Sequence, residues 1–273
     1  MKKVFISLSV LLLTLLLVII VGAITIKKSI IHVQLPHGAI LHVLPDLLNH
    51  QKDGAIIICP GGGYSYLQTW YEGYAWFPFF YIQGYTPAML EYRMPNHDYK
   101  IPMTDGADAV LMMRRHAKEW CFDAHHVGIM GSSAGGHLAS TMMEMDHDVV
   151  RPDFGILFYP LISMKKELTH IDSHDQLLGK DASQQLEEHF SNELHVSEKT
   201  PPAFIAVASD DGCVSPQNSV LFNEAMHAKN RRAELHIYPS GGHGFVCHRR
   251  SEYRGEVLEK LADWLSRMKL QKI

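Results

Sequence analysis

Short apolar runs alternate with longer amphipathic stretches along most of this chain. The apolar runs are followed by turn residues and cover 54–63, 86–94, 126–130, 154–160, 203–209 and 233–239. Stretches with apolar residues at helical spacing cover 104–120, 134–145 and 255–268. Such an alternation is typical of βαβ units, in which helices flank a mostly parallel sheet. The pattern therefore predicts an α/β fold, with Thr104 as the N-cap of the helix at 104–120.

Residues 161–200 interrupt this alternation. They are polar, contain few strong apolar runs and lie between two of the predicted core strands. Ligand sites of open α/β sheets lie at the carboxyl ends of the strands, so we expect this segment to form a small lid-like excursion there. No linker rich in Gly, Ser or Pro divides the chain, and residues 30–270 are predicted to form one domain.

Residues 1–24 have a different character. Two lysines follow the first methionine, and no charged residue occurs from Val4 to Ile26. This order is typical of a secretory signal, with small residues before a cleavage position after Ala23. The apolar run also reaches the length of about 20 residues that spans a bilayer, so an uncleaved membrane anchor is the alternative. Both interpretations predict export, with the domain in the periplasm, secreted, or anchored outside the cytoplasm.

Composition and charge exclude some classes of function. The formal net charge is −4 and no basic stripe is present, so nucleic-acid binding is not expected. The 18 histidines are scattered, and neither they nor the four cysteines show the spacing of a metal site. No metal is therefore expected.

A Gly-x-Ser-x-Gly motif follows the run at 126–130 and precedes a predicted helix. A serine at a sharp strand-to-helix turn adopts strained backbone angles, so the residues two before and two after it must be small. Ser133 has Gly131 and Gly135 at these positions, whereas Ser132 would have Met130, which would collide. Ser133 is therefore predicted to be a nucleophile.

A serine needs a general base that is itself oriented by a carboxylate. In serine hydrolases with this motif, the acid and then the histidine follow the serine along the chain. His243 lies in Ser-Gly-Gly-His-Gly-Phe, a glycine-rich loop directly after the predicted strand at 233–239. His236 is expected inside that strand and His227 inside a helix, so His243 is the predicted base.

Two candidate acids, Asp210 and Asp211, follow the predicted strand at 203–209. An isolated pair of loop aspartates would more commonly cap a turn. Here they share the chain with a well-placed serine and histidine. The Asp-x-x-Val spacing makes Val214 a packing residue that turns the loop into the next helix, which favours Asp211. Asp210 is the alternative.

A hydrolase of this kind also needs hydrogen-bond donors for the developing oxyanion. The backbone N–H of Ala134, next to the nucleophile, is one candidate. The glycine loop after the strand that begins at 54 offers others, because Gly62 and Gly63 carry no Cβ to obstruct approach. Gly62, Gly63 and Ala134 are therefore the predicted oxyanion hole.

Together these motifs resemble those of the exported α/β-hydrolase acetylesterases, which include carbohydrate or xylan acetylesterases and dienelactone-hydrolase-like proteins. The similarity extends from about Ile56 to Trp264 and includes, in order, CPGGGYSY, VGIMGSSAGGHLAS, RPDFGILFYPLISM and ELHIYPSGGHGF. The resemblance implies the α/β-hydrolase fold, with Ser133 as nucleophile, Asp211 as acid and His243 as base. It implies no metal and no organic cofactor.

The resemblance also implies a function: hydrolysis of small acyl esters, chiefly acetyl, on a carbohydrate such as xylan, through an acyl-enzyme. Aromatic residues after the glycine loop could form a platform for a sugar ring or pack in the core instead; they are Tyr64, Tyr66, Trp70 and Tyr71. Two alternatives remain. One is a serine exopeptidase of the prolyl-oligopeptidase type, although such enzymes usually carry a large propeller domain. The other is a catalytically inactive hydrolase-fold binding protein, although such proteins commonly lose the serine or histidine.

Two of the cysteines lie in the loops that carry the predicted acid and base. Cys213 follows Asp211, and Cys247 lies four residues after His243. The triad must bring these two loops together, so a disulfide between them is conceivable in an oxidising compartment. Two free thiols are the alternative.

Overall fold

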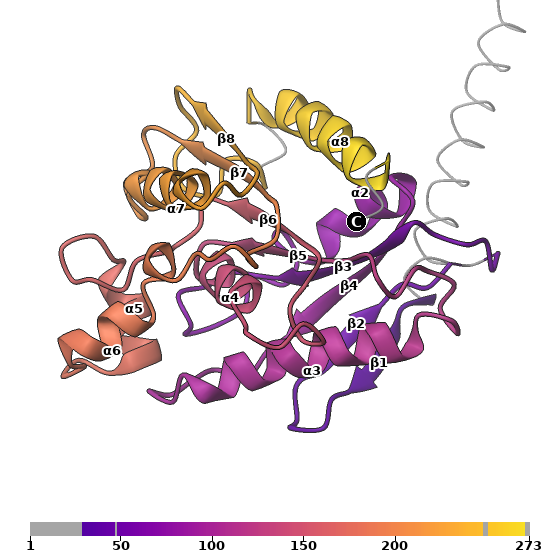
Figure 1. The fold of residues 1–273 in the computed structure, drawn as a ribbon, viewed down its shortest axis with the longest axis horizontal. Coiled ribbons are helices and arrows are strands. Elements are labelled where there is room, and N and C mark those ends of the chain that lie inside the picture. Colours follow the sequence, from indigo (N-terminus) through magenta and orange to yellow (C-terminus); the bar gives the residue numbers. More distant parts are fainter. Residues whose placement is uncertain (1–28, 47, 248–250, 271–273) are drawn as a thin grey trace, which may run out of the picture.

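A single mixed sheet forms the centre of the molecule in the computed structural model, which describes residues 29–46, 48–247 and 251–270 (Figure 1). The strand order is β1-β2-β4-β3-β5-β6-β7-β8. The strands β1, β2 and β4 pair antiparallel, and all other neighbours pair parallel. The strands are β1 (Ile31–Gln34), β2 (Ile40–Val43), β3 (Gly54–Cys59), β4 (Tyr85–Glu91), β5 (Val127–Ser132), β6 (Phe154–Phe158), β7 (Ala203–Ala208) and β8 (Ala233–Tyr238). The predicted mostly parallel sheet is confirmed.

Helices cover both faces of this sheet (Figure 1). Alternate residues of β3 point to opposite faces of the sheet, each with its own hydrophobic core. Ala55 and Ile57 belong to the core between the sheet and helices α3, α4 and α7. Ile56 and Ile58 belong to the core between the sheet and helices α2 and α8. A strand buried on both faces reads as a continuous apolar run, as β3 does. The helices are η1 (Tyr74–Trp76), α2 (Phe77–Ile82), α3 (Lys100–His116), α4 (Ala134–Met143), α5 (Ile171–Leu178), α6 (Gln184–His189), η2 (Asn192–Leu194), α7 (Gln217–Ala228) and α8 (Arg254–Leu270).

Helix α3 begins before the predicted position. Its first residue is Lys100, and Tyr99 precedes it without a side-chain capping bond, so Thr104 lies inside the helix and is not its N-cap. Pro102 explains the difference, because proline in the first turn lacks only an N–H that would have no helical partner there. The prediction for Thr104 was wrong.

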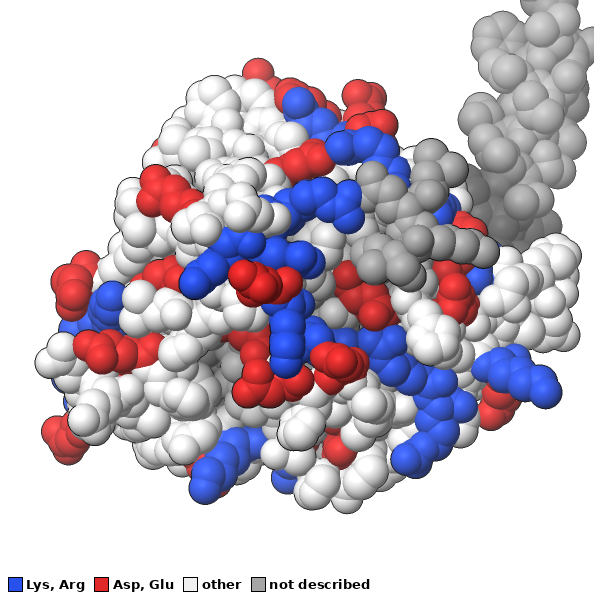
Figure 2. Space-filling model, viewed as in Figure 1, with Lys and Arg blue, Asp and Glu red and all other residues white. Residues whose placement is uncertain are grey.

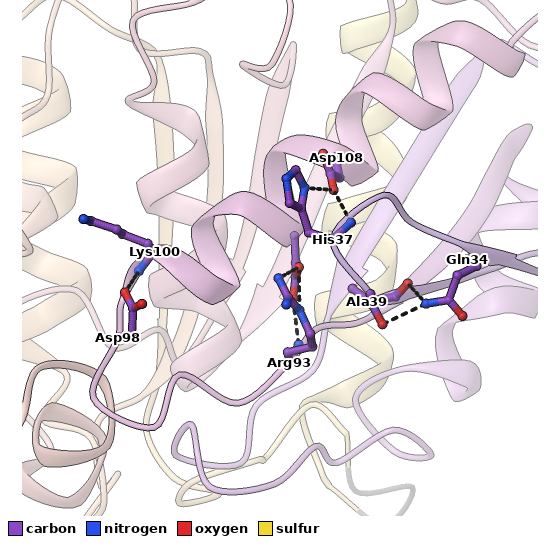
Figure 3. Close-up of polar contacts among 9 residues, drawn as sticks. Gln34, His37, Ala39, Arg93, Asp98, Lys100 and Asp108 are labelled. Carbon is purple, nitrogen blue, oxygen red and sulfur yellow. Dashed lines mark hydrogen bonds and ion pairs between the residues drawn. The ribbon is translucent and has the colours of Figure 1, made fainter.

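Two carboxylates of α3, those of Asp105 and Asp108, attach the helix to the chain on either side of β2 and β4. The guanidinium of Arg93, directly after β4, contacts both carboxylate oxygens of the fully buried Asp105 at 2.7–3.1 Å. One turn further, Asp108 accepts hydrogen bonds from the backbone N–H and the imidazole of His37, at 3.3 and 2.7 Å (Figure 3). These contacts fix the helix that precedes β5, the strand that leads to Ser133.

The segment 161–200 contains α5, α6 and η2. Two residues at the start of this segment's first helix, His170 and Asp172, line the same cavity as Ser133. The segment therefore lies at the carboxyl edge of the sheet; a lid function stays a prediction. Residues 1–24, the predicted leader, lie outside the described residues. Within the described ranges, no helix is long and apolar enough to cross a membrane.

Charged side chains of both signs are interspersed on the face viewed in Figure 2. Lys and Arg side chains lie beside Asp and Glu over most of its central part. This mixed surface agrees with the small formal net charge of −4.

Candidate active site

Ser133 lies in the sharp turn between β5 and α4, with φ of 53° and ψ of −124°. Residues other than glycine rarely adopt positive φ, and such strain persists only where the surrounding structure enforces it. A Cβ on Gly131 would lie 2.0 Å from the carbonyl oxygen of Gly135, and a Cβ on Gly135 would lie 2.0 Å from that of Cys59. Both distances are far too short for a side chain. The steric reason for the two glycines is therefore confirmed.

The structure brings the three predicted triad residues together from three loops at the carboxyl edge of the sheet. The Oγ atom of Ser133 lies 2.9 Å from Nε2 of His243, and Nδ1 of the same ring lies 2.8 Å from Oδ2 of Asp211. Since a carboxylate can only accept, Nδ1–H donates to Asp211 and leaves Nε2 to accept from the serine hydroxyl. This arrangement gives the tautomer that a general base requires.

The adjacent aspartates have different partners. The side chain of Asp211 is fully buried, and its Oδ1 accepts the backbone N–H groups of Cys213 at 2.9 Å and Val214 at 3.0 Å. Asp210 is exposed and accepts the N–H groups of Gly242 at 2.8 Å and Gly241 at 3.2 Å. The hydrogen bond from Gly242, with that from Gly241, lowers the pKa of Asp210. Asp211 thus orients the imidazole, and Asp210 holds the loop that carries it.

Two of the three predicted oxyanion-hole residues line the cavity in front of Ser133. They are Gly62 and Gly63, with φ of 131° and 64°. Ala134, the first residue of α4, is fully buried. Among the described residues, none accepts a hydrogen bond from the N–H of Gly62, Gly63 or Ala134. These groups remain available to a ligand, and their role as oxyanion donors stays a prediction.

The sequence of this chain matches the profile of a protein family. A profile of the alpha/beta hydrolase fold family matches residues 88–247, more than half of the chain. The chain belongs to the alpha/beta hydrolase family. The resemblance inferred from the motifs is confirmed.

Several relatives of this α/β hydrolase are carbohydrate-active proteins. An acetylxylan esterase of Xylanibacter ruminicola is 40% identical over 215 residues, which are 77% of this chain and 45% of the relative. Endo-1,4-beta-xylanase B of Butyrivibrio fibrisolvens is 32% identical over 212 residues, which are 71% of this chain and 33% of the xylanase. The chain thus spans less than half of either curated relative. The crystal structure of an acetyl ester-xyloside bifunctional hydrolase from Caldicellulosiruptor lactoaceticus has a TM-score of 0.77 and 31% identity, covering 84% of this chain and 88% of that one.

The cavity of this α/β hydrolase has a volume of about 340 Å³. It opens in front of Ser133 and His243, and within the described residues no Leu, Ile, Val, Phe or Met lines it. Its wall consists of glycine backbone, two tyrosine rings and polar side chains. The remaining lining residues are Gly62, Gly63, Ser65, Tyr66, Gln68, Tyr71, Glu72, His170, Asp172, Cys213, Gly244 and Cys247. Within the described ranges, the cavity included, no group of three or more His, Cys, Asp or Glu is arranged to hold a metal.

The four aromatic residues after the glycine loop divide between the cavity, the surface and the core, and their role as a platform for a sugar ring stays a prediction. Tyr66, Trp70 and Tyr71 are all exposed, but only Tyr66 and Tyr71 line the cavity. Tyr64 is fully buried and its hydroxyl lies 2.9 Å from Nδ1 of His137, so it belongs to the core. Its φ of 59° turns the ring inward, which the order of residues alone does not reveal.

The conceivable disulfide between Cys213 and Cys247 is not formed. Both residues are free thiols, Cys213 exposed and Cys247 buried. The sulfur of Cys247 instead lies 3.0 Å from the hydroxyl of Tyr159. The alternative of two free thiols is therefore confirmed.

Sequence reasoning assigned no role to Glu72, which lies in the wall of the cavity. It is 8% exposed, and its oxygens accept the N–H of Gly61 at 2.6 Å and the hydroxyl of Tyr159 at 2.9 Å. The Tyr159 ring packs edge-on against the His243 ring, with centroids 4.8 Å apart. These partners lie 11 and 87 residues away along the chain, so no local pattern of residues indicates the contacts.

The buried His137 of α4 connects the glycine loop to the segment 161–200. Its Nε2 lies 2.8 Å from the carbonyl oxygen of Phe190, so Nε2–H donates and Nδ1 accepts from the hydroxyl of Tyr64. A neutral ring satisfies both contacts. Burial lowers the pKa of His137 to about 4.

The stability of the protein is expected to fall at acid pH because of His137. The unfolded chain takes up the proton near pH 6.5, whereas the folded ring resists it until about pH 4. The neutral His137 therefore makes its full contribution to the free energy of unfolding above pH 6.5. This free energy declines as the pH falls toward 4, and the loss is about 2 kcal/mol at about pH 5. Urea unfolding of the wild type and His137→Gln at about pH 7.5 and 5 measures it. The free energy of unfolding should fall less between the two pH values in His137→Gln than in the wild type. Equal decreases in the two proteins would contradict the assignment of the acid sensitivity to His137.

Proposed function

We propose that this α/β hydrolase is a serine esterase that removes acetyl groups from a carbohydrate such as xylan. The observation that carries the proposal is the continuous hydrogen-bonded series from Ser133 through His243 to Asp211, which opens into a polar cavity. The acetylxylan esterase among its relatives supports the substrate class. A strained serine with an oriented base beside backbone donors is the arrangement that acyl transfer requires.

The first half of the proposed reaction forms an acyl-enzyme. Nε2 of His243 takes the hydroxyl proton of Ser133 while Oγ attacks the ester carbonyl carbon. The oxyanion accepts hydrogen bonds from the N–H groups of Ala134 and of Gly62 or Gly63. Collapse of the tetrahedral intermediate breaks the bond to the alcohol oxygen, which leaves with the proton from His243. The acetyl group then remains on Oγ as an ester.

The second half returns the serine. A water molecule takes the place of the alcohol and gives its proton to His243 as it attacks the acetyl carbon. The second tetrahedral intermediate uses the same donors, and its collapse releases acetate. Ser133 recovers the proton from Nε2, and Asp211 stabilises the imidazolium in both halves. No other group is consumed in the cycle.

The lining of the cavity supports a short acyl group and a hydroxylated alcohol. Long acyl chains gain affinity from apolar walls, at about 1–3 kcal/mol for a methylene that fits. This cavity has no aliphatic side chain among its described lining residues. Its carboxylates, amide and hydroxyls can instead exchange hydrogen bonds with sugar hydroxyls, and the exposed rings of Tyr66 and Tyr71 offer apolar faces.

An ester series tests the proposal directly. We expect kcat/KM to fall by more than about tenfold from acetate to octanoate esters of one phenol, because extra methylenes find no apolar wall. Acetate release from acetylated xylan or xylo-oligosaccharides is expected with the wild type. Measuring all substrates with Ser133→Ala in parallel removes background hydrolysis. A preference for octanoate would contradict the proposed specificity.

The same experiment separates the two other functions. Cleavage of a dipeptide amide without cleavage of any acetyl ester would indicate a serine exopeptidase. No turnover of any substrate, together with no labelling of Ser133 by an organophosphate, would indicate an inactive binding protein.

A further inference from the structure

The proposed mechanism does not use the buried carboxylate of Glu72, although it lies in the wall of the cavity that contains Ser133. Its two oxygens accept hydrogen bonds from different parts of the chain. One oxygen accepts the backbone N–H of Gly61, and the other accepts the hydroxyl of Tyr159.

A line of hydrogen bonds extends from Glu72 toward the histidine loop. The single O–H of Tyr159 is donated to Glu72, so the contact of 3.0 Å with Cys247 must be an S–H donated to the Tyr159 oxygen. Burial, with the charge of Glu72 as the second cause, raises the pKa of the Cys247 thiol to about 12, and the donor proton is present. The direction of every bond is thereby determined.

These bonds join the elements that must be placed relative to one another for catalysis. Gly61 directly precedes Gly62 and Gly63, the proposed oxyanion donors. Tyr159 follows β6 and packs against the His243 ring, and Cys247 belongs to the loop after that histidine. One carboxylate therefore connects the donor loop with the residue that packs on the base.

The glycine loop has almost no freedom at its contact with Glu72. A Cβ on Gly61 would lie 2.6 Å from Oε2 of Glu72, 2.8 Å from the carbonyl oxygen of Ser132 and 2.9 Å from Cβ of Ser133. The backbone of Gly61 thus lies between Glu72 and the turn of the nucleophile. Loss of the carboxylate would open one side of this contact.

We infer that Glu72 is the positioning residue of the oxyanion hole. It acts through Gly61 and does not touch the reacting atoms: its carboxylate holds the loop so that the N–H groups of Gly62 and Gly63 lie ready for the oxyanion before the reaction begins. Donors fixed in advance stabilise the transition state without reorganisation. This inference rests on the proposed esterase function.

Two substitutions separate the position of Glu72 from its charge. Glu72→Ala leaves the Gly61 N–H and the Tyr159 hydroxyl without their acceptor. Glu72→Gln can accept the Gly61 N–H on its carbonyl oxygen and donate its amide N–H to the Tyr159 oxygen. Because misplacement by about 1 Å can cost about 100-fold, we expect Glu72→Ala to lower kcat for an aryl acetate by about that factor with little change in KM. Glu72→Gln should recover most of the loss.

A sulfur substrate distinguishes positioning from a general loss of folded enzyme. The donors of an oxyanion hole bind developing negative charge on oxygen better than on sulfur, so the wild type should hydrolyse an aryl acetate faster than the matching thionoacetate. Glu72→Ala should reduce this oxygen-to-sulfur rate ratio, because it displaces the N–H groups of the oxyanion hole and leaves the three triad side chains in place. Tyr159→Phe removes one of the two bonds and should give an intermediate ratio. Glu198→Ala, which removes an exposed carboxylate outside the cavity, should leave the ratio unchanged.

Different results would overturn the positioning role of Glu72 and the proposed esterase function. Equal loss on both substrates in Glu72→Ala and Tyr159→Phe would overturn the positioning role, and so would a Glu72→Gln variant as impaired as Glu72→Ala. If Glu72→Ala does not fold, the ratio in Tyr159→Phe decides the question alone. A wild-type enzyme without activity on any ester would instead overturn the proposed function.

Discussion

Replacing Ser133 by alanine is expected to abolish ester hydrolysis, with kcat lower by about six orders of magnitude. The substitution removes the hydroxyl that lies 2.9 Å from Nε2 of His243 at the wall of the cavity. The remaining donors and the cavity can bind a substrate, so KM should change far less than kcat. The measurement is the initial rate on an aryl acetate, with single-turnover detection of the acyl-enzyme by mass spectrometry.

Ser132→Ala is the matched control for this substitution. Ser132 is the adjacent residue, fully buried at the end of β5, and it does not line the cavity. We expect Ser132→Ala to retain most of the activity and to form the acyl-enzyme normally. A Ser133→Ala enzyme that still hydrolysed the acetate ester and became acylated would refute the assignment of the nucleophile.

Asp211→Asn is expected to lower kcat by about 10⁴-fold, because an amide can donate its N–H to Nδ1 and favour the wrong tautomer of His243. Asp210→Asn keeps an oxygen that can accept from Gly241 or Gly242 and leaves the imidazole contact intact. Its effect on kcat should therefore be much smaller. Initial rates of both variants on one acetate ester compare the two aspartates directly.

The activities of Asp211→Asn and Asp210→Asn can also contradict the assignment of the acid. If Asp210→Asn were the more damaging change, the contact of 2.8 Å between His243 and Asp211 would not be the one that matters in catalysis. Circular dichroism of both variants shows whether a loss of activity reflects a loss of fold. The alternative acid left open by the order of residues would then replace Asp211.

The parallel part of the sheet could be predicted because its strands are buried on both faces. Strand β3 is a continuous apolar run followed by a glycine loop, and β6 and β7 are apolar runs followed by a proline and by two aspartates. The hairpin of β1 and β2 was not predicted, because its short strands carry histidines, and a pattern of apolar residues does not detect them. The helix α2 was also missed, since its run of aromatic residues and a proline shows no helical spacing.

The geometry of the site could be predicted where a residue's role depends on its immediate neighbours. The glycines around Ser133 and those around His243 are such neighbours, and the structure brings these side chains within hydrogen-bond distance. The residues that were missed depend on distant partners. Tyr64 was assigned to a platform although a contact with His137, 73 positions away, keeps it in the core, and the contacts of Glu72 are just as remote.

The position of β8 has a consequence for the synthesis of the protein. It is an edge strand that pairs only with β7, and the loop after it carries His243, which lies 110 residues after Ser133 in the chain. The ribosome therefore completes the turn of the nucleophile long before it makes the base. In the proposed mechanism, the nascent chain carries a nucleophile without its base until β8 has paired with β7, so ester hydrolysis can begin only after this edge of the sheet has folded.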